Sequence, residues 1–589
     1  MKSLFERREF FLSMQFKNRI CIMSVAIFII AILFNSSTIF ANEQDVDFPL
    51  ENGDRHEILI DVKVMLNWLG YDGIQVTDYY GNWTETRVSQ FQEDSGLPAS
   101  GVLDSETYNT LVDSYSSVFQ EGGSHENVSE FKEQLKEIGF GGMLITDNFG
   151  SYTAQRVSDF QEYYGLDATG EANTETMLML QELLNHPLQE GKRHNDLIEW
   201  KQKLNQLDFG YIKETDYFGS WSDNRVRAFQ DTYGLVVNGI IDDPTKDKIN
   251  QLISHPLQKD NRHDDLIEIK HMLNWLGYDR IAVSTYFGSW TETRVQQFQE
   301  NQGIPAHGIV DELTRSHLES ELTRVYQEGG SHGKIVDLKY KLDDLGFGGI
   351  LKTENYGSFT AQRVGELQKY YGLATTGNIN TETLLMIEEI LDSPFQEGKR
   401  HPDLIDWKEK LNRLDFGYIQ ETDYFGNWSD NRVRSFQETY GLAVNGIIDE
   451  PTQTKINQLI SHPLQVGNEH DDLIEIKHML NWLGYDRIGV STYFGSWTST
   501  RVEQFQEDQG IPAHGIVDSL TRNHLENEFN RTYREGGSHS KIEDLKEKLD
   551  ELGFGGILIT ENFGSYTATR VRDYQNYYEL QVTGTITLE

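Results

Sequence analysis

Cysteine is almost absent from this sequence, because Cys21 is the only one among 589 residues. A disulfide framework, a zinc site built on cysteines and a cysteine nucleophile are therefore excluded. Basic residues are also scarce: 52 Lys and Arg stand against 93 Asp and Glu, which gives a formal net charge of −41. This charge argues against nucleic acids and anionic lipid surfaces as partners, since both recruit clustered Lys and Arg.

Long apolar runs are missing except near the N-terminus. Lys17 and Arg19 precede an apolar run from Ile20 to Phe34, and small or polar residues follow up to Ala41. This order is typical of a secretory signal peptide, so we predict one over residues 1–41. The run is shorter than the about 20 residues that a membrane span needs. An uncleaved anchor is the alternative, and Met14 is an alternative start. The remaining chain is expected to be secreted, without a membrane segment.

What the sequence has instead is an internal 69-residue repeat. A histidine recurs at this step eight times, and glycine, arginine and glutamine columns keep the same spacing. The string MLNWLGYD recurs at Met65, Met272 and Met479, in every third repeat, which indicates duplication of a block of three repeats. The predicted repeats are 49–117, 118–186, 187–255, 256–324, 325–393, 394–462, 463–531 and an incomplete 532–589.

The eighth repeat differs from the others. A complete copy would need 11 more residues, which would form most of its third helix. Glu579 also occupies a position that is glycine in the other seven repeats. The sequence leaves open whether the chain is a fragment of a longer product or ends in a decayed cap.

Each repeat is predicted to form three short helices. Leu59, Val62 and Leu66 recur at steps of three and four, as on the buried side of a helix that ends near Gly70. Asn82 is expected to cap a second helix, with Glu85 as its capping-box partner. A third helix is expected to begin at Asp104. No alternating apolar run is long enough for a sheet, so we predict an all-α tandem array of eight small three-helix units.

These motifs resemble the peptidoglycan-binding-like domain found on bacterial cell-wall hydrolases. The resemblance covers about residues 49–589 and rests in the first repeat on Leu66-Asn67-Trp68-Leu69-Gly70-Tyr71, Tyr80-Gly81-Asn82-Trp83-Thr84, Val88-Ser89-Gln90-Phe91-Gln92, Gly96-Leu97, Gly101 and Thr107. It implies a small three-helix fold, bacterial peptidoglycan as the partner and a location in the cell wall. Two positions depart from the family, because Thr77-Asp78 replaces Asp-Gly and Arg87 replaces a common alanine.

Catalytic and metal-binding motifs are missing as well. His-Glu-x-x-His and P-loop patterns are absent from the sequence. Gly329-Gly330-Ser331-His332-Gly333 fits the letters Gly-x-Ser-x-Gly, but it belongs to the Gly-Gly-Ser-His segment that precedes a first helix. Gly-Gly-Ser-His precedes the first helix in three repeats, but other repeats have Gly-Lys-Arg-His there, so we interpret the histidine as a helix-start residue. We expect no enzyme activity, no metal and no cofactor.

Three functions remain open from the sequence. The first is a secreted protein that binds peptidoglycan through many weak modules. The second is the wall-targeting region of a hydrolase whose catalytic domain lies beyond residue 589. The third is a structural surface array without a glycan ligand.

The candidate ligand site is an aromatic residue followed four positions later by an arginine. An aromatic ring can pack on a sugar, and a guanidinium can pair with a carboxylate of the peptide stem. The alternative is structural, with the aromatic capping the core and the arginine stacked on it. The pairs are Trp83 and Arg87, Tyr152 and Arg156, Trp221 and Arg225, Trp290 and Arg294, Phe359 and Arg363, Trp428 and Arg432, Trp497 and Arg501, and Tyr566 and Arg570.

Overall fold

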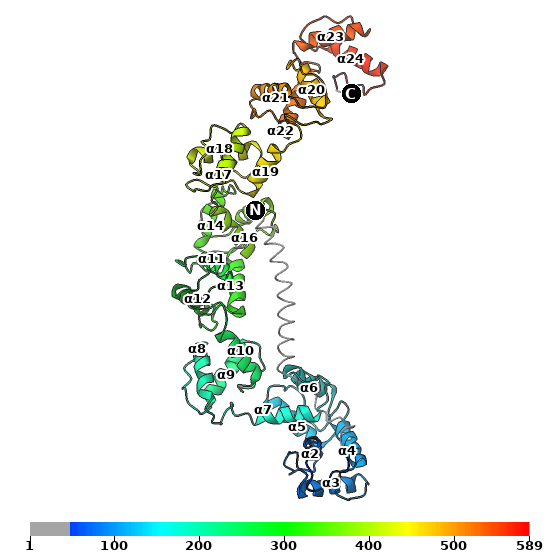
Figure 1. Cartoon of the computed structure of the whole chain (residues 1–589), viewed down its shortest axis with the longest axis vertical. Coiled ribbons are helices and arrows are strands. Elements are labelled where there is room, and N and C mark those ends of the chain that lie inside the picture. Colours follow the sequence, from blue (N-terminus) through cyan, green and yellow to red (C-terminus); the bar gives the residue numbers. More distant parts are fainter. Residues whose placement is uncertain (1–46, 588–589) are drawn as a thin grey trace. The chain divides into compact units, whose positions relative to one another are not determined.

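The computed structural model describes residues 47–587 as helices joined by loops (Figure 1). Within this range there are 23 helices, and only isolated bridges pair extended residues, so the all-α prediction is confirmed. The predicted signal peptide, residues 1–41, lies outside the described residues. None of the helices in this range is long and apolar enough to span a membrane.

Three helices make up a repeat. The first helices are α2 (Ile58–Trp68), α5 (Glu126–Glu137), α8 (Leu197–Gln206), α11 (Asp265–Trp275), α14 (Lys334–Asp344), α17 (Leu404–Arg413), α20 (Leu473–Trp482) and α23 (Lys541–Glu551). The second helices are α3 (Asn82–Asp94), α6 (Ser151–Tyr163), α9 (Ser220–Thr232), α12 (Ser289–Gln302), α15 (Ser358–Tyr370), α18 (Asn427–Thr439), α21 (Ser496–Gln509) and α24 (Ser565–Tyr577). The third helices are α4 (Ser105–Val118), α7 (Thr174–Leu184), α10 (Asp243–Ile253), α13 (Glu312–Val325), α16 (Thr381–Leu391), α19 (Glu450–Ile460) and α22 (Ser519–Thr532).

The first helix buries the apolar stripe that the sequence predicts. Leu59, Val62 and Leu66 of α2 are fully buried. Gly70 then takes a left-handed backbone with φ of 92°, and the N–H of Tyr71 donates to the Leu66 carbonyl at 2.9 Å. This is the expected helix end, because a residue without Cβ enters the left-handed region at little cost.

The predicted cap of the second helix was wrong by one residue. Gly81 is the N-cap of α3, and Asn82 is already helical, so no side chain caps the helix. The Asn82 and Glu85 side chains both accept hydrogen bonds from Asn52 instead, at 2.5 and 2.8 Å. The fully buried ring of Tyr80 fixes the chain just before the helix, which leaves Gly81 as the extended residue at the entry. The third helix begins as predicted, because Asp104 accepts from the Thr107 N–H at 2.8 Å.

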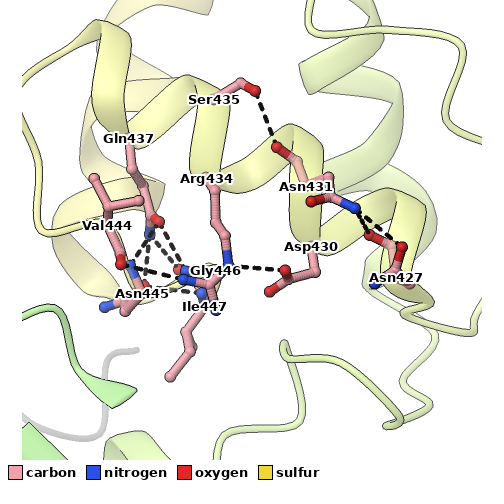
Figure 2. A network of polar contacts seen from close by, with 10 residues as sticks. All are labelled: Asn427, Asp430, Asn431, Arg434, Ser435, Gln437, Val444, Asn445, Gly446 and Ile447. Carbon is pink, nitrogen blue, oxygen red and sulfur yellow. Dashed lines mark hydrogen bonds and ion pairs between the residues drawn. The ribbon is translucent and has the colours of Figure 1, made fainter. Parts of the chain in front are cut away.

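A buried glutamine joins the second helix to the loop before the third. In repeat 6, Gln437 accepts a hydrogen bond from the Gly446 N–H at 2.9 Å and donates to the Ile447 carbonyl at 2.9 Å (Figure 2). The same pair of bonds is present in all eight repeats. The repeated glutamine column is therefore a structural clamp whose amide is fully paired.

Neighbouring repeats are packed against one another inside each of two compact units, which divide after His255. In the first unit, α2 of repeat 1 packs against α7 of repeat 2, and Tyr115 donates to the Ala172 carbonyl at 2.8 Å. In the second unit, α11 of repeat 4 packs in the same way against α16 of repeat 5. The repeats within a unit are thus not isolated beads.

Candidate functional site

The aromatic residue of the predicted site lies at the second position of the second helix and is exposed in every repeat. Its exposed fraction runs from 44% for Phe359 to 65% for Trp83. The ring therefore does not fill the core, and the structural alternative keeps only its second part, the arginine stacked on the ring. The preceding aromatic residue, such as Tyr80 in repeat 1, is fully buried and fills that place.

The arginine of each pair stacks on the exposed ring. The distance from its Cζ atom to the ring centroid is 4.4–5.6 Å across the eight repeats. The structure thus places both predicted residues on one helix face, as their spacing of four requires. Ligand binding by the pair stays a prediction.

The arginines differ in their polar partners. In repeats 2, 5 and 8 the arginine pairs with a carboxylate three residues later, for example Arg156 with Asp159 at 3.1 Å. In repeats 1, 4 and 7 a glutamine accepts from it, and in repeat 1 Arg87 also lies 3.8 Å from the Asp72 carboxylate. In repeats 3 and 6 that position is Ala228 or Ser435. Within residues 47–587, Arg225 and Arg432 make no ion pair or hydrogen bond with a carboxylate.

A second stack of an arginine on a tyrosine is present in four repeats, and sequence reasoning missed it. In repeat 3, Arg193 lies 5.0 Å from the Tyr217 ring and pairs with Asp216 at 2.7 Å. The Tyr217 ring covers Gly219, the N-cap residue of the second helix. In the sequence, the arginine precedes the first helix and the tyrosine follows it. The pair therefore lacks the spacing of three or four residues that reveals neighbours on one helix. The same stack occurs between Arg55 and Tyr79, Arg262 and Tyr286, and Arg400 and Tyr424.

The loop after the first helix reaches the exposed pair. A Cβ atom on Gly142 would lie 3.1 Å from the Tyr152 hydroxyl, and one on Gly73 would lie 3.9 Å from the Arg87 guanidinium. This loop position has a left-handed backbone in every repeat, although its residue type varies. The residues are Gly73, Gly142, Tyr211, Arg280, Gly349, Tyr418, Arg487 and Gly556.

The comparison with known protein families identifies the repeat. The family described as "Putative peptidoglycan binding domain" matches residues 55–111, 124–180, 193–249, 262–318, 331–387, 400–456, 469–525 and 538–589, which together are more than half of the chain. The chain belongs to this family. No curated protein matches the sequence.

Each peptidoglycan-binding repeat also contains a buried lysine that the sequence analysis did not single out. Lys201 is only 2% exposed, and its ammonium donates to the carbonyls of Thr215 at 2.9 Å and Tyr217 at 2.5 Å. Burial lowers the pKa of this lysine. The lysine holds the loop that presents Tyr217 to the surface. Its equivalents are Lys63, Lys132, Lys270, Lys339, Lys408, Lys477 and Lys546.

The repeated histidine starts the first helix of each peptidoglycan-binding repeat, as predicted. The Nδ1 atom of His56 accepts from the Ile58 N–H at 3.1 Å, and the equivalent bond is present in the other seven repeats. Between residues 47 and 587, no three His, Asp or Glu side chains are grouped as a metal ion would need.

Proposed function

We propose that this protein is secreted, has no catalytic site of its own, and holds bacterial peptidoglycan through several weak, similar sites. The observation that carries the proposal is the exposed aromatic ring with its stacked arginine, which recurs at one place in all eight family repeats. An exposed ring offers an apolar face to a sugar. The guanidinium and the free N–H groups at the helix start favour a carboxylate.

Several weak sites suit a polymeric ligand. A repeat of this size has a small core and a shallow surface, so one site binds weakly. Once one repeat is bound to a glycan strand, the others bind intramolecularly, and the apparent affinity rises by roughly 10²–10⁴. The repetition is therefore the main source of affinity in this proposal.

Sedimentation with purified, insoluble peptidoglycan tests the function. We expect the protein to be retained in the pellet, and we expect retention to fall when Trp83, Trp221, Trp290, Trp428 and Trp497 are replaced by alanine. Tyr340→Ala is the matched control, because Tyr340 is an exposed aromatic residue on the first helix of repeat 5. Helical circular dichroism should be unchanged in both variants.

The possible outcomes test the aromatic site and peptidoglycan binding separately. Retention that is unchanged in the tryptophan variant rejects the aromatic site. Loss of helical signal in that variant assigns the tryptophans to folding and also rejects it. If the unmodified protein is not retained at low and moderate salt, peptidoglycan binding itself is rejected.

The non-catalytic part of the proposal has its own test. In a zymogram on peptidoglycan, the 589-residue chain should give no cleared band. A cleared band at its mass of 67.8 kDa would contradict the proposal. Clearing only by a larger native product would identify the chain as the targeting region of a hydrolase.

A further inference from the structure

Two tyrosines have an unfavourable left-handed backbone conformation, although their side chains are almost fully exposed. Tyr211 has φ of 62° and is 93% exposed, and Tyr418 has φ of 60° and is 92% exposed. The left-handed region disfavours any side chain with a Cβ atom. Four other repeats have glycine at this position, so the fold does not require a ring there. The two tyrosines occupy equivalent positions of the duplicated blocks and count as one observation.

The position of these tyrosines places them beside the candidate site. In repeats 1 and 2 the same loop residue, Gly73 or Gly142, adjoins the arginine or the aromatic residue of the exposed pair. Tyr211 occupies the same loop position in repeat 3, whose exposed pair is Trp221 and Arg225. Tyr217, whose ring lies against Gly219 at the entry of the second helix, is a third exposed ring of repeat 3.

In repeats 3 and 6 the arginine of the exposed pair has neither the carboxylate nor the glutamine partner that it has in the other six repeats. Trp221 and Trp428 each have the guanidinium 4.4 Å from the ring centroid. Neither Arg225 nor Arg432 is paired with a carboxylate of the described chain, as shown above. In a protein with a net charge of −41, a cation without an acidic neighbour is available for a carboxylate of the ligand.

We propose that Tyr211 and Tyr418 contact the ligand and make repeats 3 and 6 the principal sites for the glycan strand of peptidoglycan. Three exposed rings fit the apolar faces of consecutive sugar rings, and the arginine fits a carboxylate of the peptide stem attached to the strand. The strong negative charge of the protein disfavours polyanionic wall polymers as the occupant. This inference rests on the proposed function and assigns its ligand to specific repeats.

The test titrates a soluble disaccharide-peptide fragment of peptidoglycan into the full chain by calorimetry. We expect two stronger sites per chain. In the double variant Tyr211→Gly, Tyr418→Gly, these sites should weaken about tenfold, the effect of one lost aromatic contact. The unfolding temperature should stay equal or rise, because glycine relieves the backbone strain.

The matched control is Arg280→Gly with Arg487→Gly. These residues occupy the same left-handed position in repeats 4 and 7, with φ of 71° and 69°. We expect the stronger sites to be unaffected. A soluble N-acetylglucosamine oligomer should displace the fragment. Displacement by the free stem peptide but not by the oligomer would overturn the assignment to the glycan strand.

The remaining outcomes distinguish the two proposals. Unchanged affinity in the tyrosine variant, with intact retention on insoluble peptidoglycan, overturns the present inference and leaves the proposed function standing. Weaker binding with a lower unfolding temperature makes the tyrosines structural and also overturns the inference. If the unmodified protein binds neither the fragment nor the insoluble wall, both proposals fall.

Discussion

At the scale of single residues, the buried lysine explains how each repeat orders its longest loop. The loop between the first two helices has no strand partner beyond isolated bridges. One ammonium per repeat instead gathers at least two backbone carbonyls, as Lys63 does with those of Thr77 and Tyr79. A buried carbonyl without a hydrogen-bond donor destabilises the fold. The lysine ammonium supplies the donors that a neighbouring strand would supply in a sheet.

We predict that Lys201→Met destabilises repeat 3 by about 1–3 kcal/mol, because the Thr215 and Tyr217 carbonyls lose their shared donor. Hydrogen exchange across residues 210–220 and thermal unfolding of the full chain measure the effect. Lys192→Met is the control, since Lys192 is exposed and should change stability by less than about 0.5 kcal/mol. Equal effects of the two substitutions would contradict the structural role.

A second residue-scale prediction concerns Glu579. It has φ of 57°, at a position where the other seven repeats have glycine with the same left-handed backbone. Glu579→Gly should stabilise repeat 8 by about 1 kcal/mol. Gly510→Glu should destabilise repeat 7 by a similar amount. Slower hydrogen exchange in residues 541–577 of the first variant is the expected readout, and faster exchange there would refute the strain argument.

At the scale of elements, a tyrosine that follows the second helix anchors the third helix of the next repeat. Tyr164 donates to Asp242 at 2.9 Å and Tyr371 to Asp449 at 2.8 Å, and each aspartate is the N-cap of its helix. Tyr440 and Asp518 repeat this contact between repeats 6 and 7 at 3.1 Å. The same carboxylate thus caps a helix and joins two repeats.

His514 adds a pH-sensitive group to the contact between repeats 6 and 7. Its Nδ1 atom accepts from the Ile516 N–H at 3.2 Å, so the proton lies on Nε2, which is 3.1 Å from the Tyr440 hydroxyl. Burial lowers the pKa of His514, although Asp518 and Asp415 oppose this, and His462 lowers it slightly. The unfolded chain therefore takes up a proton at a higher pH than the folded chain does.

We predict that acidification below about pH 6.5 removes stability from this contact, because protons then favour the unfolded state. His514→Asn should abolish that part of the pH dependence. Asparagine is the natural residue at this position in repeat 6, where Asn445 contacts Tyr371 at 3.4 Å. Thermal unfolding of both proteins between pH 5 and pH 7 provides the measurement, and parallel pH profiles would refute the role of His514.

At the scale of the whole molecule, the charge of −41 acts against any polyanionic wall. Repulsion between the two is screened over about 8 Å at physiological salt. We predict that retention on Gram-positive peptidoglycan is unchanged or increases as salt rises from low values. Binding of the small soluble fragment should depend on salt less than binding of the wall. A steep loss of wall retention with added salt would sink this prediction.

Local patterns in the sequence predict the features whose partners lie within a turn of helix or recur at a fixed step. The 69-residue period, the three helices, the left-handed end at Gly70, and the stacking of Trp83 with Arg87 all follow from local spacing. The other contacts join residues that come together only when the chain is folded. Lys63 binds carbonyls of an irregular loop well beyond the end of its own helix, and Arg55 stacks on Tyr79 across the whole first helix. The contacts between repeats also depend on how separate helices pack, which no local pattern encodes.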